Sequence, residues 1–444
     1  MLKVWWFPEY TPSEQLIFDD IKRIIETSYA SFWYVHIETP AVEKNEILLK
    51  GGEEASKEIF GLYGMASGAD DLKGYGLRFD LTIPFTRYVL DHQQDLVFPF
   101  KRYQVQKVRR GERQQKWRFK EFYQADIDVI RRQGEGKVKY LRYDAELIYL
   151  LRKTLELVRA KYLPDFVIKT HINNRNILGG LFTHLVGDDM EKKQQLSKLF
   201  DSYYKMSKED FEQSLSDLVG DQLAIVQQFL SFDITTLSED FIDNEEYRTG
   251  VGQLKEVFAS LNLLNTDLGN IFVYDPFIVR GLDYYTGTVF ENLIENDIAM
   301  GSICSWGRYA NLTQSLDPKS VAFDGVGGSI GLSRLFTLIL ENYSSEQQKS
   351  SSEYLLLHFS ETFASSLSIA KELQKQGKIV EVYPWPDKLK KQFAYADKKW
   401  IQKVIICGEE ELEQGVYKVK DMETGEEEVI QPRIPSCYGI RTAG

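Results

Sequence analysis

The stretch RRGERQQKWRFKEFYQADID, from Arg109 to Asp128, decides the fold. Its first half is dense in arginine and other charged residues. Its second half alternates aromatic and polar residues, which is typical of a strand. The preceding segment, FPFKRYQVQKVRR (98–110), reads as a strand that leads into the same loop. We therefore predict a long antiparallel hairpin with an arginine-rich tip.

The tip of this hairpin allows two interpretations. Arg110, Glu112 and Arg113 stand around Gly111, a residue that lets the backbone bend close to a ligand. Arginine matches phosphate oxygens in bidentate geometry, and a nearby carboxylate can accept from an amino group or help to hold a metal. The alternative is an ordinary solvated loop, and the returning strand bears on the choice.

Polar side chains gather on one face of that returning strand. Alternation places Phe122, Gln124, Asp126 and Asp128 on one face, opposite Phe119, Tyr123, Ile127 and Val129. A sheet face with a ring, an amide and two carboxylates is expensive to bury without a polar ligand. We therefore predict that this face is the floor of a binding site.

Composition restricts the class of protein. A chain of 444 residues, 43% of them hydrophobic, suits two or three ordered domains. The net charge of -12 argues against indiscriminate binding of nucleic acid, so an RNA partner would need a local basic patch. Scattered Cys304, Cys407 and Cys437 form no disulfide framework or CxxC metal site, which favours a reducing cytoplasm. No apolar run approaches ~18 residues, so we predict neither export nor a membrane span.

The segments before the hairpin carry recognisable signals. Thr11 followed by Pro12 predicts the start of a helix. YVHIETPAVE (34–43) predicts a strand that is broken at Pro40. GYGLRFDLTIPFTRYVL (74–90) predicts a strand, a proline turn and a helix. On a pleated strand, Asp80 and Thr82 would share a face.

The segments after the hairpin divide the rest of the chain. Residues from about 176 to 250 lack strand alternation and predict a helical insertion. Strand signals return at 270–279 and continue through TGTVFENLI. The C-terminal part comprises a linker rich in Ser and Gln at 342–352, a small α/β domain at 353–430 and a tail without an element pattern at 431–444.

Two further constellations could carry chemistry. In VRGLDYYTGTVFE (279–291), Arg280 and Asp283 flank a tight turn at Gly281. These two residues could form an ion pair that braces the turn, or they could be part of a site. In GVGGSIGLSRL (325–335), glycines lead into a helix with Arg334 near its start. That arrangement can bring backbone and a guanidinium group to a nucleotide, or it can simply be a tight packing turn.

Together these segments resemble the histidyl-tRNA synthetase family of class II aminoacyl-tRNA synthetases, over nearly the whole chain. The first helix with YVHIETPAVE resembles motif 1. In that family, the proline that corresponds to Pro40 lies at the dimer interface. The hairpin resembles motif 2, and GVGGSIGLSRL resembles motif 3. RGLDYY is similar to the first histidine signature, and FDLT (79–82) to the histidine-pocket strand.

The resemblance implies an α+β fold: an antiparallel sheet with flanking helices and a helical insertion, followed by a C-terminal α/β domain that binds the anticodon. It implies a class II catalytic domain at 1–341 with the insertion at about 176–250, and an anticodon-binding domain at 353–430; the tail stays unassigned. The substrates would be ATP with Mg2+, L-histidine and tRNA(His). The protein would be a homodimer in the cytoplasm, without a metal site built from its own side chains.

The resemblance also implies residue roles. Arg110 and Glu112 would address the α-phosphate and adenine, Phe122 would stack on adenine, and Arg334 would hold the γ-phosphate. Arg280 would stabilise charge developing on the α-phosphate. Arg110 and Arg280 would be the two catalytic residues. The residues implied to bind histidine are Asp80, Leu81, Thr82, Arg110, Gln124, Asp128, Arg280, Tyr284, Tyr285 and Tyr309.

Two functions compete on this basis. The first is ATP-dependent ligation of histidine to tRNA(His) through a histidyl-adenylate. The second is a non-catalytic, histidine-sensing relative, such as the synthetase-like subunit of ATP phosphoribosyltransferase, which usually lacks the C-terminal domain. The α/β segment at 353–430 favours the enzyme. Its DKLKKQFAYADKK helix (387–399) suits an RNA backbone as a local basic patch, although a solvated helix would look the same.

Departures from the family pattern involve tryptophan. The second histidine signature usually reads Gly-Gly-Arg-Tyr-Asp, whereas this chain reads SWGRYANL with Trp306 and Ala310. Five of the seven tryptophans fall where glycine is usual, namely Trp6, Trp33, Trp117, Trp306 and Trp400. One hypothesis is that the source organism reads UGA as glycine and that the codon was translated as tryptophan. The alternative is that the tryptophans are real, in which case Trp306 should crowd the histidine pocket.

Overall fold

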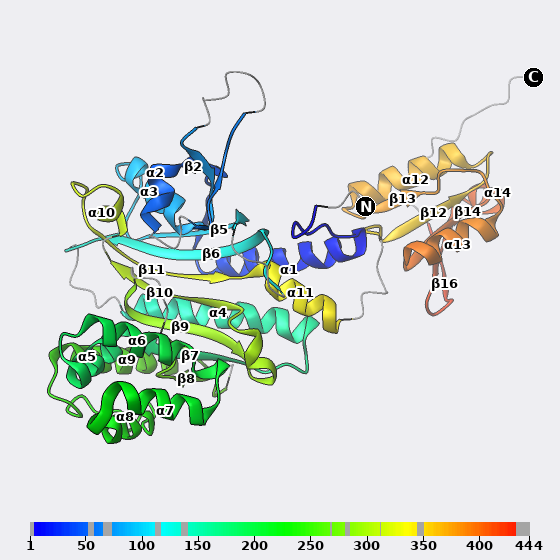
Figure 1. Cartoon of the computed structure of the whole chain (residues 1–444). Coiled ribbons are helices and arrows are strands. Elements are labelled where there is room, and N and C mark those ends of the chain that lie inside the picture. Colours follow the sequence, from blue (N-terminus) through cyan, green and yellow to red (C-terminus); the bar gives the residue numbers. More distant parts are fainter. Residues whose placement is uncertain are drawn as a thin grey trace, which may run out of the picture. The chain divides into compact units, whose positions relative to one another are not determined.

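The computed structural model describes residues 4–51, 57–64, 73–111, 117–134, 141–266, 269–279, 285–310, 312–343 and 350–431 (Figure 1). The chain divides into two compact units. The first comprises Met1–Pro8 and Ile21–Tyr343, and the second comprises Glu9–Asp20 and Ser344–Gly444. Each unit contains a large sheet of its own.

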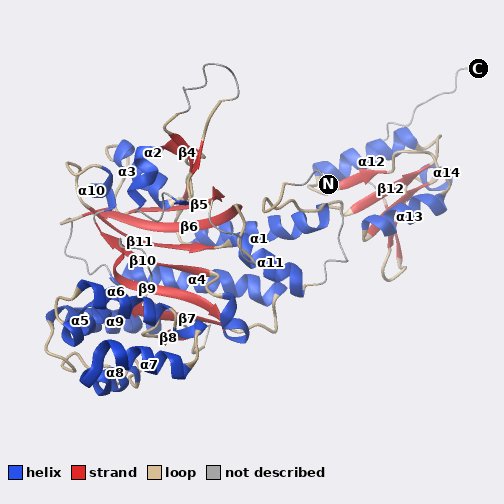
Figure 2. Cartoon of the chain, in the orientation of Figure 1, coloured by secondary structure: helices blue, strands red, loops and turns tan. Residues whose placement is uncertain are grey.

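The first unit is built on an eight-stranded sheet with the order β1-β5-β6-β11-β10-β9-β7-β8 (Figure 2). Its two edge pairs, β1 with β5 and β7 with β8, are parallel, and all pairs between them are antiparallel. The predicted antiparallel sheet is therefore confirmed. The strands are β1 (Val35–His36), β5 (Phe100–Arg109), β6 (Glu121–Arg132), β7 (Ile168–Asn174), β8 (Phe272–Tyr274), β9 (Tyr285–Ile294), β10 (Cys304–Ala310) and β11 (Phe323–Ile330).

The predicted hairpin forms the middle of this sheet. Strands β5 and β6 pair without a bulge from Phe100 opposite Ile130 to Arg109 opposite Glu121. Regular pairing preserves the alternation of faces, so Gln124, Asp126 and Asp128 share one face as predicted. We call this face the polar face of the sheet.

Helices cover the opposite face. They are α1 (Pro12–Ser31), α4 (Leu141–Tyr162) and α11 (Leu332–Asn342). Helix α1 reaches β6 through the hydroxyl of Tyr29, which donates to the carbonyl of Ala125 at 3.3 Å. Helix α11 does so through Ser333, whose hydroxyl oxygen accepts the backbone N–H of Tyr123 at 2.9 Å. The predicted start of α1 is confirmed, because Thr11 and Glu14 exchange capping hydrogen bonds there.

Near β5, a small sheet of order β2-β4-β3 supports helix α3 (Thr82–His92). Its strands are β2 (Val42–Lys44), β3 (Phe60–Gly61) and β4 (Tyr75–Leu77). Two expectations for this region are wrong. Strand β4 ends before Asp80, and Leu81 already has helical dihedral angles, so Asp80 and Thr82 share no strand face. Pro84 lies inside the first turn of α3 instead of in a separate turn, where proline is tolerated.

The predicted helical insertion is confirmed as helical. After β7 the chain forms α5 (Arg175–Val186), α6 (Met190–Asp201), α7 (Lys208–Val219), α8 (Leu223–Leu230) and α9 (Glu245–Leu264). Figure 1 shows these helices grouped beside β7, β8 and β9. Their buried apolar residues include Phe200, Phe211 and Leu215, and the rings of Phe200 and Phe211 pack against Phe277, which follows β8.

The second unit has a five-stranded sheet of order β13-β12-β14-β15-β16. Strands β12 (Tyr354–His358), β13 (Val380–Val382) and β14 (Lys403–Cys407) are parallel and alternate with helices α12 (Phe363–Lys375) and α13 (Leu389–Lys399). This matches the predicted α/β pattern. A hairpin of β15 (Tyr417–Asp421) and β16 (Glu427–Ile430), which was not predicted, completes the sheet. The tail from residue 432 lies outside the described residues.

Candidate active site

A buried ion pair lies at the centre of the polar face. Arg102 and Asp128 are register partners, and Nη2 of Arg102 lies 2.6 Å from Oδ2 of Asp128. Tyr309 donates its hydroxyl to Oδ1 of Asp128 at 2.9 Å. Burial raises the pKa of Asp128, and the positive charge of Arg102 opposes that rise. Two of the predicted site residues, Asp128 and Tyr309, are therefore in direct contact, and Asp128 is also paired with Arg102, which sequence reasoning missed.

A signal for Arg102 was present in the sequence. Arg102, Gln104 and Gln106 alternate along β5, directly opposite Asp128, Asp126 and Gln124 in the antiparallel register. Polar residues at every second position of two paired strands are typical of a buried polar layer. Only the register, which the structure supplies, shows that the arginine faces the carboxylate.

Two other polar groups of β6 are buried with few partners. Gln124 donates Nε2 to Oγ of Ser329 at 3.4 Å, but its Oε1 accepts no hydrogen bond from the described residues. Neither carboxylate oxygen of fully buried Asp126 accepts a well-formed hydrogen bond from them, although Ser329 is close enough to favour the charged form. A buried polar group without partners is costly, so this face suits a polar ligand.

The glycines of β11 leave room for these side chains. A Cβ atom on Gly327 would lie 2.2 Å from Oδ1 of Asp128, and one on Gly325 would lie 2.2 Å from the ring of Tyr309. These two glycines lie inside β11, and the chain passes from this strand into α11 at Gly331, so the glycine-rich segment leads into a helix as expected. They serve the polar face by their lack of a side chain.

The Gly327→Ala variant should lose about 1–3 kcal/mol of unfolding free energy, because the added methyl group must displace the Asp128 carboxylate. Urea denaturation followed by fluorescence measures this loss. Gly252→Ala in α9 is the matched control, since its Cβ would meet nothing closer than 3.8 Å. Because alanine has a higher helix propensity than glycine, the control substitution should leave the unfolding free energy unchanged or raise it. Equal stability of the two variants would contradict the tight fit at Gly327.

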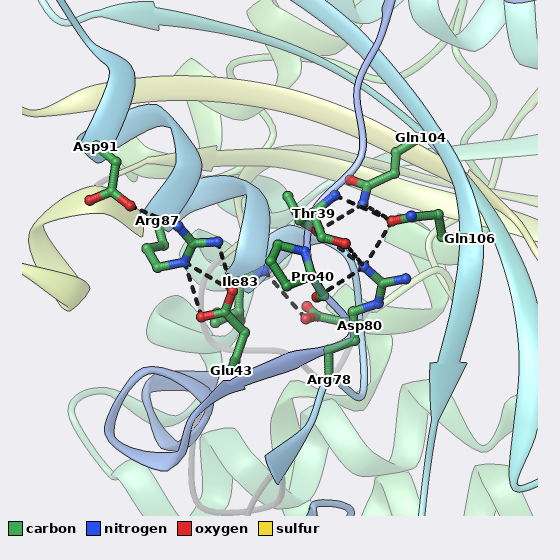
Figure 3. A network of polar contacts seen from close by, with 10 residues as sticks. All are labelled: Thr39, Pro40, Glu43, Arg78, Asp80, Ile83, Arg87, Asp91, Gln104 and Gln106. Atoms are coloured by element: carbon green, nitrogen blue, oxygen red, sulfur yellow. Dashed lines mark hydrogen bonds and ion pairs between the residues drawn. The ribbon is translucent and has the colours of Figure 1, made fainter. Parts of the chain in front are cut away.

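The FDLT segment places a carboxylate at the start of α3. Oδ1 of Asp80 accepts the backbone N–H of Ile83 at 3.3 Å (Figure 3). Burial raises the pKa of Asp80 to about 6, and the positive charge of Arg110 is among the effects that oppose the rise. The hydroxyl of Thr82 is buried without a partner among the described residues. Leu81 is fully buried, so its side chain belongs to the core.

Arg78 joins this segment to the hairpin and was also missed. Its Nη1 donates to the carbonyl of Thr39 at 2.6 Å, to that of Pro40 at 3.2 Å and to Oε1 of Gln106 at 2.8 Å (Figure 3). Its Nε donates to the carbonyl of Lys107 at 3.0 Å. One side chain thus fixes the Pro40 segment against β5, beside Asp80.

Arg110, which directly follows β5, approaches the same segment. Its Nε donates to the carbonyl of Phe79 at 3.0 Å and lies 3.5 Å from Oε2 of Glu58. Its guanidinium carbon is 5.3 Å from the centre of the Phe122 ring. Arg110 and Phe122, both predicted for the nucleotide, therefore lie together beside FDLT. A Cβ atom on Gly111 would make only ordinary contacts at 3.5 Å or more, so space does not require glycine there.

The remaining predicted residues are only partly described. Tyr285 begins β9, is buried, and is paired in register with Tyr309. Arg334, in α11, donates Nη1 to the carbonyl of Ser302 at 2.7 Å. Glu112, Arg280 and Tyr284 lie outside the described residues.

The segment around the second histidine signature is a strand. Cys304–Ala310 forms β10, and its pairing with β9 shifts register between Gly307 and Tyr309. Arg308 binds Asp144 of α4, with Nε 3.2 Å from Oδ1. The side chain of Trp306 lies outside what the structure describes, so the crowding expected from it stays a prediction.

Charge in the polar face should make stability depend on pH. Burial raises the pKa of Asp126 to about 7, and Asp128 adds to the rise. The unfolded chain ionises this group near 3.8, so raising the pH between these values favours unfolding. Thermal unfolding from about pH 4 to about pH 8 should therefore show a loss of stability that is smaller in Asp126→Asn. Parallel curves for the two proteins would refute this contribution.

Two features of the described residues bear on other functions. They contain no group of three or more His, Cys, Asp or Glu side chains placed to hold a metal ion. None of their helices combines the length and the apolar character that crossing a membrane requires.

Comparison with known proteins gives consistent matches. Residues 7–335 match the family model described as histidyl-tRNA synthetase, and residues 357–432 match the one described as anticodon binding domain. The chain is 38% identical to histidine-tRNA ligase of Clostridium tetani over 95% of its length and 94% of that protein. It is 37% identical to the ligase of Finegoldia magna, over 95% of each chain.

Solved structures agree in fold. Histidyl-tRNA synthetase from Nostoc sp. PCC 7120 superposes with a TM-score of 0.84 at 30% identity and covers 97% of this chain and 96% of its own. A protein from Bacillus halodurans, described as an ATP phosphoribosyltransferase regulatory subunit/histidyl-tRNA synthetase, superposes with a TM-score of 0.71 over 92% of this chain and 98% of its own. At 20% identity, that second likeness shows the fold alone.

Proposed function

The chain belongs to the histidyl-tRNA synthetase family and is a histidine-tRNA ligase, and on this premise we propose that it works in two steps through a histidyl-adenylate. In the first step, a carboxylate oxygen of L-histidine attacks the α-phosphorus of ATP, and pyrophosphate leaves with the electrons of the broken P–O bond. In the second, a hydroxyl of the terminal ribose of tRNA(His) attacks the acyl carbon, and AMP leaves. The observation that carries the proposal is the Asp128–Arg102–Tyr309 cluster on the polar face.

The polar face and the start of α3 supply groups that match L-histidine. The ammonium group needs a carboxylate, and Asp80, with a raised pKa and a place beside Arg110, would be ionised by such a cation. Thr82 and Gln124 each hold a buried oxygen without a partner among the described residues. Asp128, held by Arg102, and Tyr309 suit an imidazole N–H of the same substrate. Tyr284 and Tyr285 are proposed around the ring, and the Leu81 contribution is restricted to its backbone.

Nucleotide binding is assigned to the end of the hairpin. Phe122 offers a ring for adenine, and Arg110 offers a guanidinium for the α-phosphate, 5.3 Å from that ring centre. Glu112 and Arg334 are proposed for adenine and the γ-phosphate. Attack on a phosphate needs positioning and electrostatic stabilisation more than covalent help, so Arg110 and Arg280 act by charge.

Histidine-tRNA ligases use ATP with Mg2+, and this chain fits such use. Mg2+ in nucleotide sites is bound by substrate phosphates, water and one or two carboxylates. The described residues hold no preformed group of metal-binding side chains, which is compatible with that mode. When bound, the ion would neutralise charge on the phosphates.

Recognition of tRNA is assigned to the second unit, within residues 353–430. Lys391 and Lys399 of α13 already pair with Asp387 at 3.1 Å and Glu381 at 2.7 Å, so the predicted basic patch is partly neutralised. The RNA contact of this helix is therefore proposed for its remaining lysines. A homodimer with Pro40 near its interface and a cytoplasmic location are further proposals of the same assignment.

The non-catalytic alternative is less favoured. The likeness to the Bacillus halodurans protein reaches 20% identity, compared with 37–38% for the ligases. In addition, residues 357–432 match the model described as anticodon binding domain, which suits an enzyme that acts on tRNA.

The proposal is tested by ATP-pyrophosphate exchange with each amino acid in turn. We expect exchange with L-histidine and Mg2+ only, followed by transfer of labelled histidine to tRNA(His). Asp128→Asn is the paired variant and should reduce exchange with histidine. Exchange with another amino acid instead of histidine would contradict the specificity. Histidine binding without exchange would support the regulatory alternative.

A further inference from the structure

Tryptophan occupies an unusual backbone conformation in this chain. Within the described residues, four non-glycine residues have a positive φ, and all four are tryptophans: Trp6 at 68°, Trp33 at 63°, Trp117 at 63° and Trp400 at 55°. Residues other than glycine rarely adopt this left-handed backbone region, and those that do are enriched in Asn, Asp and His. A bulky ring there is an outlier, so the exclusive use of tryptophan requires an explanation.

Trp33 shows what the backbone requires. It follows the end of α1, where the N–H of Tyr34 donates to the carbonyl of Tyr29 at 3.4 Å and the N–H of Trp33 donates to that of Ala30 at 3.0 Å. These two bonds are the Schellman motif, whose left-handed residue is usually glycine. The side chain of Trp33 is 80% exposed, so packing of the indole does not account for the conformation.

Trp400 repeats this arrangement in the other unit. At the end of α13, the N–H of Ile401 donates to the carbonyl of Ala396 and that of Trp400 to Asp397, both at 3.1 Å. Helix α12 of the same unit ends with the same two kinds of hydrogen bond, both at 3.0 Å. There the residue with the left-handed conformation is Gly377. The same motif thus has glycine at one helix end and tryptophan at two others.

The other two positions are turns. Val4 accepts the N–H of Phe7 at 3.4 Å, so Trp6 is the third residue of a β-turn, where a positive φ requires glycine or asparagine. Trp117 lies in a turn at the end of the hairpin loop, and its Nε1 donates to Oε1 of Glu341 at 3.1 Å. By contrast, Trp5, Trp306 and Trp385 do not have a positive φ.

We propose that the natural protein has glycine at positions 6, 33, 117 and 400, and that the gene encodes them by UGA codons that its organism reads as glycine. Strain retained for function would cluster at the active site, whereas Trp33 and Trp400 end helices in different units. Independent substitutions would also give a mixture of residue types. A single translation rule explains why one residue type recurs, because UGA is read as tryptophan in several genetic codes.

The coding DNA and the natural protein test this directly. We expect UGA at all four codons and, in peptides from protein isolated from the source organism, the mass of glycine at these positions. A UGG codon at position 33 or 400 would overturn the proposal, as would tryptophan in the corresponding natural peptides.

Recombinant variants test the backbone requirement separately. Trp33→Gly and Trp33→Ala both remove the indole, but only glycine relieves the positive φ, so the glycine variant should melt about 1–3 °C higher than the alanine variant. Trp400 should give the same order. Trp385, 56% exposed and without a positive φ, is the matched control. There, alanine should be the more stable, because glycine gains more entropy on unfolding. Alanine variants at 33 and 400 as stable as the glycine variants would overturn the inference.

Discussion

Replacing Arg102 with methionine should lower the free energy of unfolding by about 3–5 kcal/mol, because it leaves the Asp128 carboxylate buried without its counter-charge. The loss is expected to be large because Arg102 is fully buried and its Nη2 is 2.6 Å from Asp128. Methionine keeps much of the packing volume, including the contact with Phe85, whose ring centre is 4.1 Å from the guanidinium carbon. Urea denaturation at neutral pH would measure the effect.

The double variant Arg102→Met/Asp128→Leu separates stability from function. Removing both charges creates an apolar pair, so much of the lost stability should return, while exchange with histidine should remain reduced because Asp128 is absent. A double-mutant cycle gives the coupling free energy between the two residues. If the single Arg102→Met variant were as stable as the parent, the ion pair would not hold the polar face together.

The Arg280→Ala variant should lower the rate of histidyl-adenylate formation by a factor of ~100–1000, since a donor aimed at charge developing in the transition state is worth roughly 3–4 kcal/mol. This expectation follows from the RGLDYY motif of the family to which the chain belongs. Single-turnover formation of the adenylate, measured with saturating histidine and ATP, isolates the chemical step from binding.

Two controls distinguish this role from a structural one. Arg280→Lys keeps a positive charge and should recover part of the rate. Thermal unfolding of Arg280→Ala should match the parent if the residue acts on the reaction. If Arg280 instead braces its turn against Asp283, the variant should lose thermal stability and histidine affinity together and keep its single-turnover rate.

Local patterns in the sequence predict much of the framework well. The hairpin, the start of α1 at Pro12 and the helical insertion all follow from periodicity or capping residues, which are properties of neighbours in the chain. The polar face was likewise predictable, because alternation in β6 places Gln124, Asp126 and Asp128 together.

The errors and omissions involve interactions across the sheet. Asp80 and Thr82 were expected on a strand, but the helix begins two residues before Pro84, and tertiary context ends β4 earlier than its alternation indicates. The roles of Arg102 and Arg78 depend on partners 26 to 39 residues away, as with the carbonyl of Thr39 for Arg78. The glycines of β11 are required by side chains on neighbouring strands, which a single sequence does not reveal.

The turn at Trp6 has a consequence for inheritance. If position 6 is encoded by UGA, a ribosome in any host that treats this codon as a stop would release a peptide of five residues. The gene would then be silent outside lineages that share its code, and a transferred copy could not replace the recipient's own enzyme. The codon for the first left-handed residue of the chain would thus prevent gene exchange with such hosts, because translation would stop before any domain is synthesised.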